Sequence, residues 1–289
     1  AALENHRPER FVGRWLSTTW ARSQGAGRLA GTQDGTRGMY SAMVYGGLVY
    51  ALERGTERGR QAGLAARRAL LSIARIDHWA TGFVSRIPIG LPGYRAPFVE
   101  AHTAECAALC CDLIHPLLSA EERREVEDAL YTKGIAWMDL YLRLHGEGYL
   151  LGSNQGAVYA RGLIWAGLVA RRSHPDVDAL IERWTTWFFR MVEKYYRADG
   201  STVEGPGYWE YTTHAVIAAL LAIARHRGVA VESLIPPGMR RSLDYLLAVR
   251  SDVGEGLRFL PIADCGLKEN AYMGPSFLFF ARHAGVGEA

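Results

Sequence analysis

The sequence predicts an all-α protein whose helices form an (α/α) toroid, an incomplete ring of alternating inner and outer antiparallel helices. Two kinds of helical pattern alternate along the 289 residues. One kind is apolar and small almost all round, and such a helix must be covered on every side. The other kind is charged on one face and apolar on the opposite face. That pattern suits a helix that covers the first kind from outside.

The apolar patterns recur at a nearly constant interval. They begin near residues 39, 97, 154, 208 and 271, which gives intervals of 58, 57, 54 and 63 residues. A period of this length indicates a structural repeat, although the repeats share no obvious sequence. Two concentric layers of antiparallel helices satisfy both patterns. A plain α-solenoid is the alternative, but it would make both helices of each pair similarly amphipathic.

Composition limits the function classes. Apolar residues make up 49% of the chain, charged residues 22%, and the net charge is +3, as in an ordinary globular protein. No nucleic-acid footprint is evident, and no apolar run reaches the roughly 18 residues that a membrane span needs. We expect a single domain over 1–289. The chain lacks an initiator Met and a signal-peptide h-region, so it looks like an excised or processed segment.

The predicted elements follow in order. A capping box at Ser119 and Glu122 opens one charged helix, and Pro175 takes the first position of another. Residues 25–38 read as a Gly-rich loop and 77–96 as a long irregular stretch of the kind that is usually functional or mobile. Residues 254–264 read as a short extended pair. Helices are predicted over 9–24, 39–52, 56–76, 98–114, 120–145, 157–170, 176–197, 208–225, 238–250 and 271–284.

Cysteine and histidine usage predicts neither a disulfide framework nor a metal site. Cys106 and Cys110 lie one helical turn apart on an apolar face, which is typical of small core residues. No pair of C-x-x-C motifs and no H-x-x-x-H cluster is present. We therefore propose no metal and no cofactor.

The predicted geometry places several polar loops together. In a two-layer ring all inner helices run the same way, so their N-termini gather at one end. The stretches that precede them are Tyr94-Arg95, Ser153-Asn154-Gln155 and Glu204–Tyr211. Helix N-termini present backbone N–H groups and a favourable dipole to anions. Asn, Gln, Arg and Tyr at the same rim suit a carboxylated or sulfated sugar.

Three stretches of the sequence carry a resemblance to a known family. They are Asp199-Gly-Ser-Thr-Val-Glu-Gly-Pro-Gly-Tyr-Trp-Glu-Tyr211, Gly152-Ser-Asn-Gln155, and Cys111–Arg124 with its Leu-Ser-x-Glu-Glu-Arg cap. In this order and spacing they resemble the toroid domain of heparinase II/III-like polysaccharide lyases and related alginate lyases. The resemblance spans about residues 95–284.

The resemblance implies β-elimination of a uronate-containing anionic polysaccharide or oligosaccharide. It makes Asn154 the group that binds and neutralises the uronate carboxylate, which acidifies the C5 proton. It makes Tyr208 the tyrosine that protonates the leaving glycosidic oxygen, with Tyr211 in reserve. The same tyrosine removes the C5 proton in a syn elimination, whereas a His often does so in an anti elimination. Gln155 stands where some relatives have His.

Five residues are predicted to contact substrate: Gln155, Arg95, His102, Glu204 and Trp209. Glu204 has a second interpretation as a brace of its loop. The family usually adds a C-terminal β-sheet domain, which this chain does not contain, and it implies a secreted or periplasmic location.

Two other functions stay open. A glycoside hydrolase on the same ring needs two carboxylates across a cleft, and Glu204 with Asp264 or Asp34 are the pairs that the sequence offers. A non-catalytic glycan-binding ring would bind without turnover.

Overall fold

The computed structural model describes residues 33–75, 79, 98–251, 258–260, 262–263 and 274–284. Within these residues the regular structure is helical, apart from two strands of two residues each. The predicted helix at 9–24 and the stretch 80–97 lie outside them. None of the described helices is long and apolar enough to cross a membrane.

The helices belong to two compact units. Unit 1 comprises residues 1–141 and 165–181, and unit 2 comprises residues 142–164 and 182–289. Unit 1 contains α2 (Gln33–Leu52), α3 (Glu57–Arg75), α5 (Phe98–Leu113), η1 (His115–Leu117), α6 (Ala120–Ala129) and η2 (Leu130–Ile135). Unit 2 contains η3 (Tyr149–Gly152), α10 (Pro206–Arg227), η4 (Val231–Leu234), α11 (Pro237–Ala248), β1 (Arg250–Ser251), β2 (Arg258–Phe259) and α12 (Gly274–His283). The division falls within α7 (Ala136–His145), α8 (Asn154–Ala170) and α9 (Val177–Tyr195).

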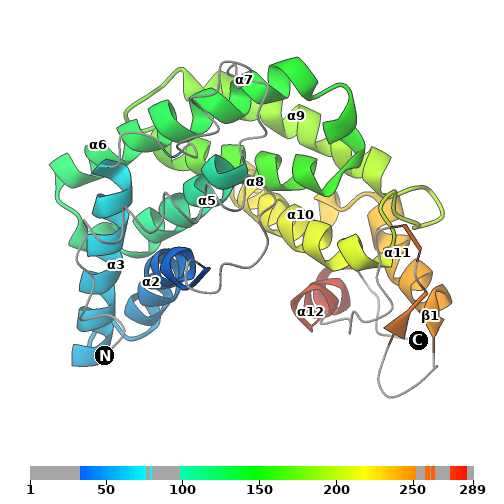
Figure 1. The fold of residues 1–289 in the computed structure, drawn as a ribbon, viewed down its shortest axis with the longest axis horizontal. Helices are drawn as coiled ribbons and strands as arrows, with labels where there is room; N and C mark the ends of the chain where they lie inside the picture. The colour runs from blue at the N-terminus through cyan, green and yellow to red at the C-terminus, as the bar shows by residue number, and fades with distance from the viewer. Residues whose placement is uncertain are drawn as a thin grey trace. The chain divides into compact units, whose positions relative to one another are not determined.

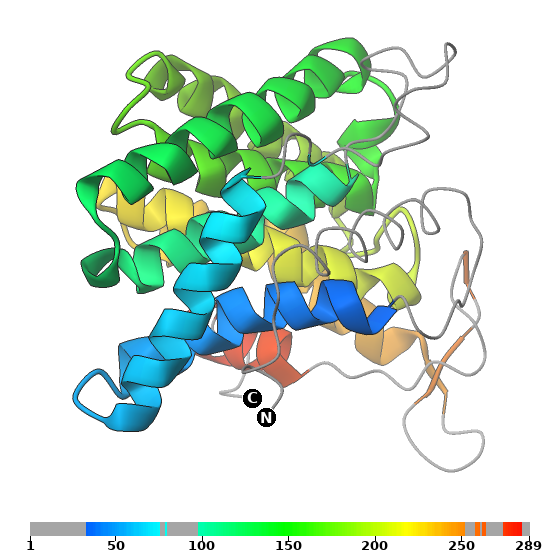
Figure 2. The same ribbon diagram turned by 60° about the vertical axis from the view of Figure 1, so that its left-hand side comes forward.

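In unit 1, small residues let α2 and α3 pack closely as an antiparallel pair (Figures 1 and 2). A Cβ added at Gly46 would lie 3.0 Å from the carbonyl oxygen of Ala62 on α3. One added at Gly63 would lie 2.7 Å from the ring of Tyr50 on α2. Gly46 and Gly63 are therefore packing positions, where close approach compensates for poor helix propensity.

In unit 1 the apolar helices α2 and α5 run parallel to each other. The hydroxyls of Tyr40 on α2 and Thr103 on α5 are 3.0 Å apart. About two to three turns further along both helices, Gly47 faces Leu113. The charged helices α3 and α6 are parallel in the same way, with ion pairs from Arg67 to Glu122 and from Arg75 to Glu125.

Unit 2 repeats this arrangement. Asn154, at the start of α8, bonds to Glu204 just before α10, and two turns later Arg161 bonds to His214 on α10. The two helices therefore run parallel. Helix α9 runs the opposite way along α10, since Glu182 near its start pairs with Arg227 at the end of α10.

Burial agrees with the two predicted patterns in α8 and α9, whereas α2 and α10, which were also predicted to be covered on every side, expose Leu52 and Leu221. No residue of α8 is exposed, whereas α9 buries Trp184, Phe188 and Met191 and exposes charged side chains on its other face. An apolar helix enclosed on all sides and an amphipathic helix beside it are the two patterns that the sequence predicts.

Local chemistry sets the helix ends. The predicted capping box is confirmed: the Ser119 hydroxyl accepts the Glu122 N–H, and the Glu122 carboxylate accepts the Ser119 N–H. Pro206 stands at the first position of α10, and Gly228, at a φ of 66°, ends that helix.

Cys110 and Cys111 are buried, and burial raises the pKa of the Cys111 thiol to about 12.

Several boundaries differ from the prediction. Helix α2 begins at Gln33, inside the stretch predicted as a Gly-rich loop, so Gly35 and Gly38 are helical. The predicted helix over 120–145 is interrupted by the π-helical turn η2. The extended pair joins 250–251 to 258–259, so it begins before the predicted 254–264. Propensity alone does not locate such ends, because they depend on tertiary contacts.

Candidate functional site

The site lies in unit 2, at the turn that leads into α10. Arg197 and Ser201 close the turn by a backbone hydrogen bond, and Gly200 has a φ of 87°. Gly205 has a φ of 80°, and a Cβ there would lie 2.4 Å from the carbonyl oxygen of Ile262. Only glycine meets both conditions without strain. The turn therefore fixes the position of Glu204 immediately before α10.

The Glu204 carboxylate caps the neighbouring helix α8. One oxygen accepts the backbone N–H of Asn154 at 2.7 Å, and the other accepts the Asn154 side-chain amide at 2.9 Å. Asn154 is the first residue of α8 and is 7% exposed. A carboxylate in this position is stabilised by the helix dipole and by charge-assisted hydrogen bonds. The two bonds join the starts of α8 and α10.

Two buried tyrosines at the end of α9, Tyr195 and Tyr196, contact α10 close to the Glu204–Asn154 hydrogen bonds. The Tyr195 hydroxyl accepts a hydrogen bond from Thr212 at 3.0 Å, and the hydroxyls of Tyr196 and Thr213 are 2.7 Å apart. Burial raises the pKa of Tyr195, and the negative charge of Glu204 adds to the effect. Burial likewise raises the pKa of Tyr196. Both phenols therefore stay protonated and hold the end of α9 against α10.

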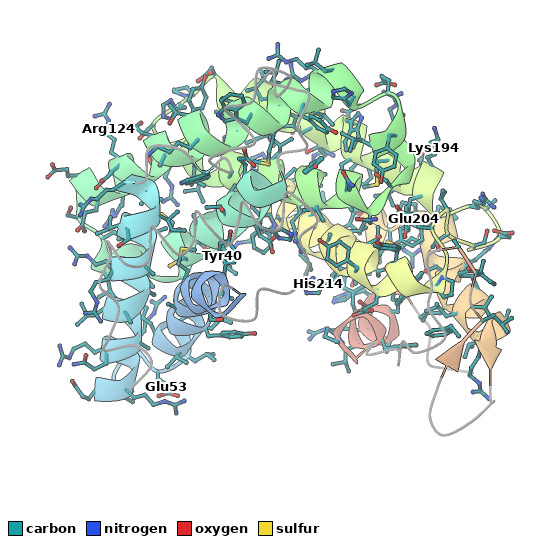
Figure 3. The ribbon with its side chains drawn as sticks, viewed as in Figure 1. Tyr40, Glu53, Arg124, Lys194, Glu204 and His214 are labelled. Atoms are coloured by element: carbon teal, nitrogen blue, oxygen red, sulfur yellow. The ribbon has the colours of Figure 1, made fainter. Side chains whose placement is uncertain are left out.

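One face of α10 carries the predicted tyrosines. Tyr208 lies in the first turn and is partly exposed, and Tyr211, one turn later, is 39% exposed. His214 follows after a further turn and is also exposed (Figure 3). Residues three or four apart lie side by side on a helix. These three side chains therefore form a continuous polar and aromatic strip, defined here as the α10 strip.

Trp209 and Glu210 contact a different helix. Trp209 is fully buried, and its ring centroid lies 5.8 Å from that of Phe280 on α12. Its ring therefore offers no exposed face for stacking on a sugar. Glu210 is half-buried, and burial raises its pKa, with partial opposition from the hydroxyl of Ser276 on α12. These two residues attach α12 to the start of α10.

Gln155 is held by two tyrosines. Its amide nitrogen donates to the Tyr149 hydroxyl at 3.4 Å, and its amide oxygen accepts from Tyr159 at 3.5 Å. Gln155 is partly exposed and follows Asn154 on α8. The sequence-predicted residues that unit 2 contains are therefore Asn154, Gln155, Glu204, Tyr208, Trp209 and Tyr211.

The other predicted residues do not join this group in the described structure. His102 belongs to α5 in unit 1, where its Nδ1 lies 3.8 Å from the Glu105 carboxylate. Arg95 and Asp264 lie outside the described residues, and Asp34 is described only as part of the backbone of α2. The carboxylate pairs that a glycoside hydrolase would need therefore fall outside what the structure describes.

The sequence analysis did not select two residues that connect α8 and α10, Arg161 and His214. Arg161 lies seven residues after Asn154 and so two turns along the same face of α8, and His214 lies three residues after Tyr211. Their spacing was visible, but a lone Arg in an apolar helix and a lone His read equally well as packed or surface groups. Only the contact between the two helices singles them out.

A surface hollow lies elsewhere. It has a volume of about 550 Å³ and belongs to unit 1. Charged residues of both signs dominate its lining, including Arg75, Glu121, Arg124, Asp128 and Lys133. None of the predicted site residues lines it. In the described part of the chain, no group of three or more His, Cys, Asp or Glu side chains is placed to hold a metal ion.

The chain matches no family model, and no curated protein matches it.

Proposed function

We propose that this chain is a polysaccharide lyase-type (α/α) toroid domain that cleaves a uronate-containing glycan by β-elimination. The observation that carries the proposal is the double hydrogen bond between Glu204 and Asn154. It brings the predicted carboxylate-binding amide to the start of the helix that bears Tyr208. The order of the motifs in the sequence, with their resemblance to heparinase II/III-like lyases, is the second support.

The toroid is supported by the repeated helix directions. In unit 1 the apolar helices α2 and α5 are parallel, and in unit 2 α8 and α10 are parallel. In each unit an antiparallel amphipathic helix packs against them. A ring of alternating inner and outer helices would repeat this arrangement of two parallel apolar helices and one antiparallel amphipathic helix.

Asn154 is the proposed carboxylate binder. Its amide nitrogen has two hydrogens, of which one donates to Glu204, leaving a second donor for a uronate oxygen. Withdrawal of charge from the uronate stabilises the negative charge that develops when C5 loses its proton. This is electrostatic stabilisation of the kind that an oxyanion hole provides.

Tyr208 is the proposed proton-transfer group. In a syn elimination its phenolate oxygen takes the proton from C5, the C4–C5 double bond forms, and the bond from C4 to the glycosidic oxygen breaks. The same phenol then gives that proton to the departing oxygen, so the enzyme ends in its starting protonation state. A positioned proton-transfer group contributes about 10²- to 10⁴-fold to the rate. Tyr211, one turn on, is the reserve candidate.

The charge of Glu204 has a consequence for substrate binding. A uronate that reaches Asn154 also approaches the Glu204 carboxylate, and two carboxylates at one site repel. A proton shared between them removes the repulsion and neutralises the uronate, which favours loss of the C5 proton. We expect uptake of about one proton on binding, measured by calorimetry in buffers of different ionisation enthalpy. Glu204→Gln should bind more tightly and abolish the uptake.

The direct test is turnover. Wild type, Tyr208→Phe and Tyr211→Phe are assayed on alginate, hyaluronan and heparan sulfate by the ultraviolet absorbance of the unsaturated product. Tyr208→Phe should lower kcat by about 10²-fold or more with nearly unchanged affinity. Tyr45→Phe, an exposed tyrosine of α2, is the matched control.

Other outcomes separate the alternatives. Unchanged turnover in Tyr208→Phe with loss in Tyr211→Phe moves the role to Tyr211. Products without the double bond indicate a glycoside hydrolase. Binding without any product indicates a glycan-binding ring. Failure to bind any of the three glycans rejects the proposal.

A further inference from the structure

We propose that α12 is a pH-dependent cover over the start of α10, held closed by the neutral Glu210 carboxyl and loosened when Glu210 ionises. The cover is independent of the proposed function, since it concerns how unit 2 closes over Trp209 and not what the site cleaves. It is carried by the packing of α12 on Trp209 and by a buried, unbonded oxygen of Glu210.

Aromatic side chains hold α12 against α10. The Trp209 ring is fully buried, and its centroid lies 5.8 Å from that of Phe280 and 6.3 Å from that of Phe277. Aromatic pairs at these separations are favourable. Movement of α12 away from α10 would remove both phenylalanines from Trp209. The ring that the sequence predicts to contact substrate would then be uncovered.

The residue after Trp209 carries a carboxyl oxygen that no hydrogen bond satisfies. The Oε2 of Glu210 is buried without a hydrogen-bond partner, and so is the hydroxyl of Ser276 on α12. That hydroxyl acts on the carboxyl and opposes the effect of burial only in part. A buried carboxylate stays ionised when two or three donors or a cation face it, and one hydroxyl falls short of this. Burial accordingly raises the pKa of Glu210.

No ion pair compensates Glu210 among the described residues. From α9 it is faced by the Tyr196 phenol, whose pKa is raised by burial and, to a smaller degree, by the charge of Glu210. From α12 it is faced by Ser276. On α10 itself, His214 lies one turn further along and contacts Arg161 on α8. A charge on Glu210 is therefore stabilised poorly while α12 is in place.

The sign of the pH effect follows from the raised pKa. With α12 displaced, the carboxyl is hydrated and its pKa returns to about 4.3. Closure is therefore most stable below about pH 4.3, loses stability as pH rises from there to the raised value, and is constant above it. Between these two values opening releases one proton, so the open population increases by up to about tenfold per pH unit.

Hydrogen exchange followed by mass spectrometry measures this opening on the full chain without any glycan. Exchange of the α12 amides, corrected for the intrinsic effect of pH, is compared with that of α11 in the same unit. In wild type the opening of α12 should increase from about pH 4 upward, while α11 shows no such rise. Glu210→Gln, which keeps the shape without the charge, should remove the rise.

Two results overturn the proposal. One is a rise that persists unchanged in Glu210→Gln. The other is an equal rise in α11, which would mean that unit 2 opens as a whole.

His283→Gln is the matched control. It removes the other ionisable contact of α12, the 2.5 Å pair with Glu232 of η4, which exists only when His283 is protonated. The rise of α12 opening with pH should persist in His283→Gln. If it disappears there and persists in Glu210→Gln, that ion pair is the switch and the proposal is wrong.

Ser276→Ala separates the pH effect from simple packing. Because the hydroxyl partly stabilises the ionised Glu210 carboxyl, its removal should extend the rise of opening to higher pH. A uniform increase of opening at every pH, or an unchanged profile, contradicts the contact between Glu210 and Ser276. None of these measurements needs a substrate, so their failure leaves the proposed function standing, and failure of the glycan assays leaves the cover standing.

Discussion

Unit 1 and unit 2 pair their apolar helices in the same parallel way but differ in what precedes those helices. In unit 1 the carboxylate at the start of α5 is Glu100, a fully buried residue of that helix itself. In unit 2 the carboxylate at the start of α8 is Glu204, which comes from the loop before another helix. The helices thus supply the architecture, whereas the loop of unit 2 adds the carboxylate of the proposed site. If this is correct, unit 2 should tolerate changes at its helix starts much less well than unit 1.

The largest effect is expected from Asn154→Asp. This change places a second carboxylate against Glu204 at a residue that is 7% exposed. An uncompensated buried charge costs about 3 to 5 kcal/mol, and denaturant unfolding measures it. The paired carboxyls would have a raised pKa in the folded state, so the loss should be smallest in acid and grow as pH rises.

Gln155→Glu is the matched control for that prediction. It adds the same charge one residue later, in the first turn of α8, where an acidic side chain is favoured. Equal destabilisation by both variants would show that the contact with Glu204 is not the cause.

Gly205→Ala should be the next most damaging change. Its Cβ would approach Ile262 to 2.4 Å in a backbone with a φ of 80°. The expected loss is about 2 to 3 kcal/mol. Gly55→Ala, in the turn of unit 1, has nothing within 4 Å of the added Cβ and should be nearly neutral. Thermal unfolding of both variants compares the two loops directly.

Glu122→Gln probes the capping carboxylate of unit 1. Burial acts to raise the pKa of Glu122, but hydrogen bonds from Ser119 and Arg67 outweigh it, so the pKa is lowered. A lowered folded pKa means that the carboxylate stabilises the protein above its unfolded pKa and loses this effect as pH falls through the folded value. We expect a loss of about 1 to 2 kcal/mol at neutral pH that disappears in acid. A pH-independent loss would contradict this account.

The smallest effect is expected from Tyr40→Phe. It removes the 3.0 Å contact with Thr103 between α2 and α5, a neutral hydrogen bond worth about 1 kcal/mol. Activity should be unchanged. A loss as large as that of Asn154→Asp would remove the contrast between the units.

Much of the fold was predictable because it depends on local chemistry. The capping box at Ser119 acts within a few residues, and the apolar character of α8 follows from its composition. Pro175, predicted at the first position of a helix, lies instead in the turn before α9, which begins at Val177. Of the candidate site, Asn154 and Glu204 were named from the sequence, but their mutual hydrogen bonds were not. Arg161 and His214 were not selected at all.

The sequence by itself determined that the described part of the chain is helical, the contrast between the enclosed helix α8 and the amphipathic helix α9, and the approximate starts of several helices. Helix caps and the apolar face of a helix depend on residues within one or two turns of each other, so the sequence pattern alone predicts them. The tertiary structure decided which helix starts meet, that Trp209 is enclosed by α12, and that Arg161 faces His214. Those outcomes depend on contacts between residues about 50 or more positions apart, and the free energy that selects them exists only once the helices pack.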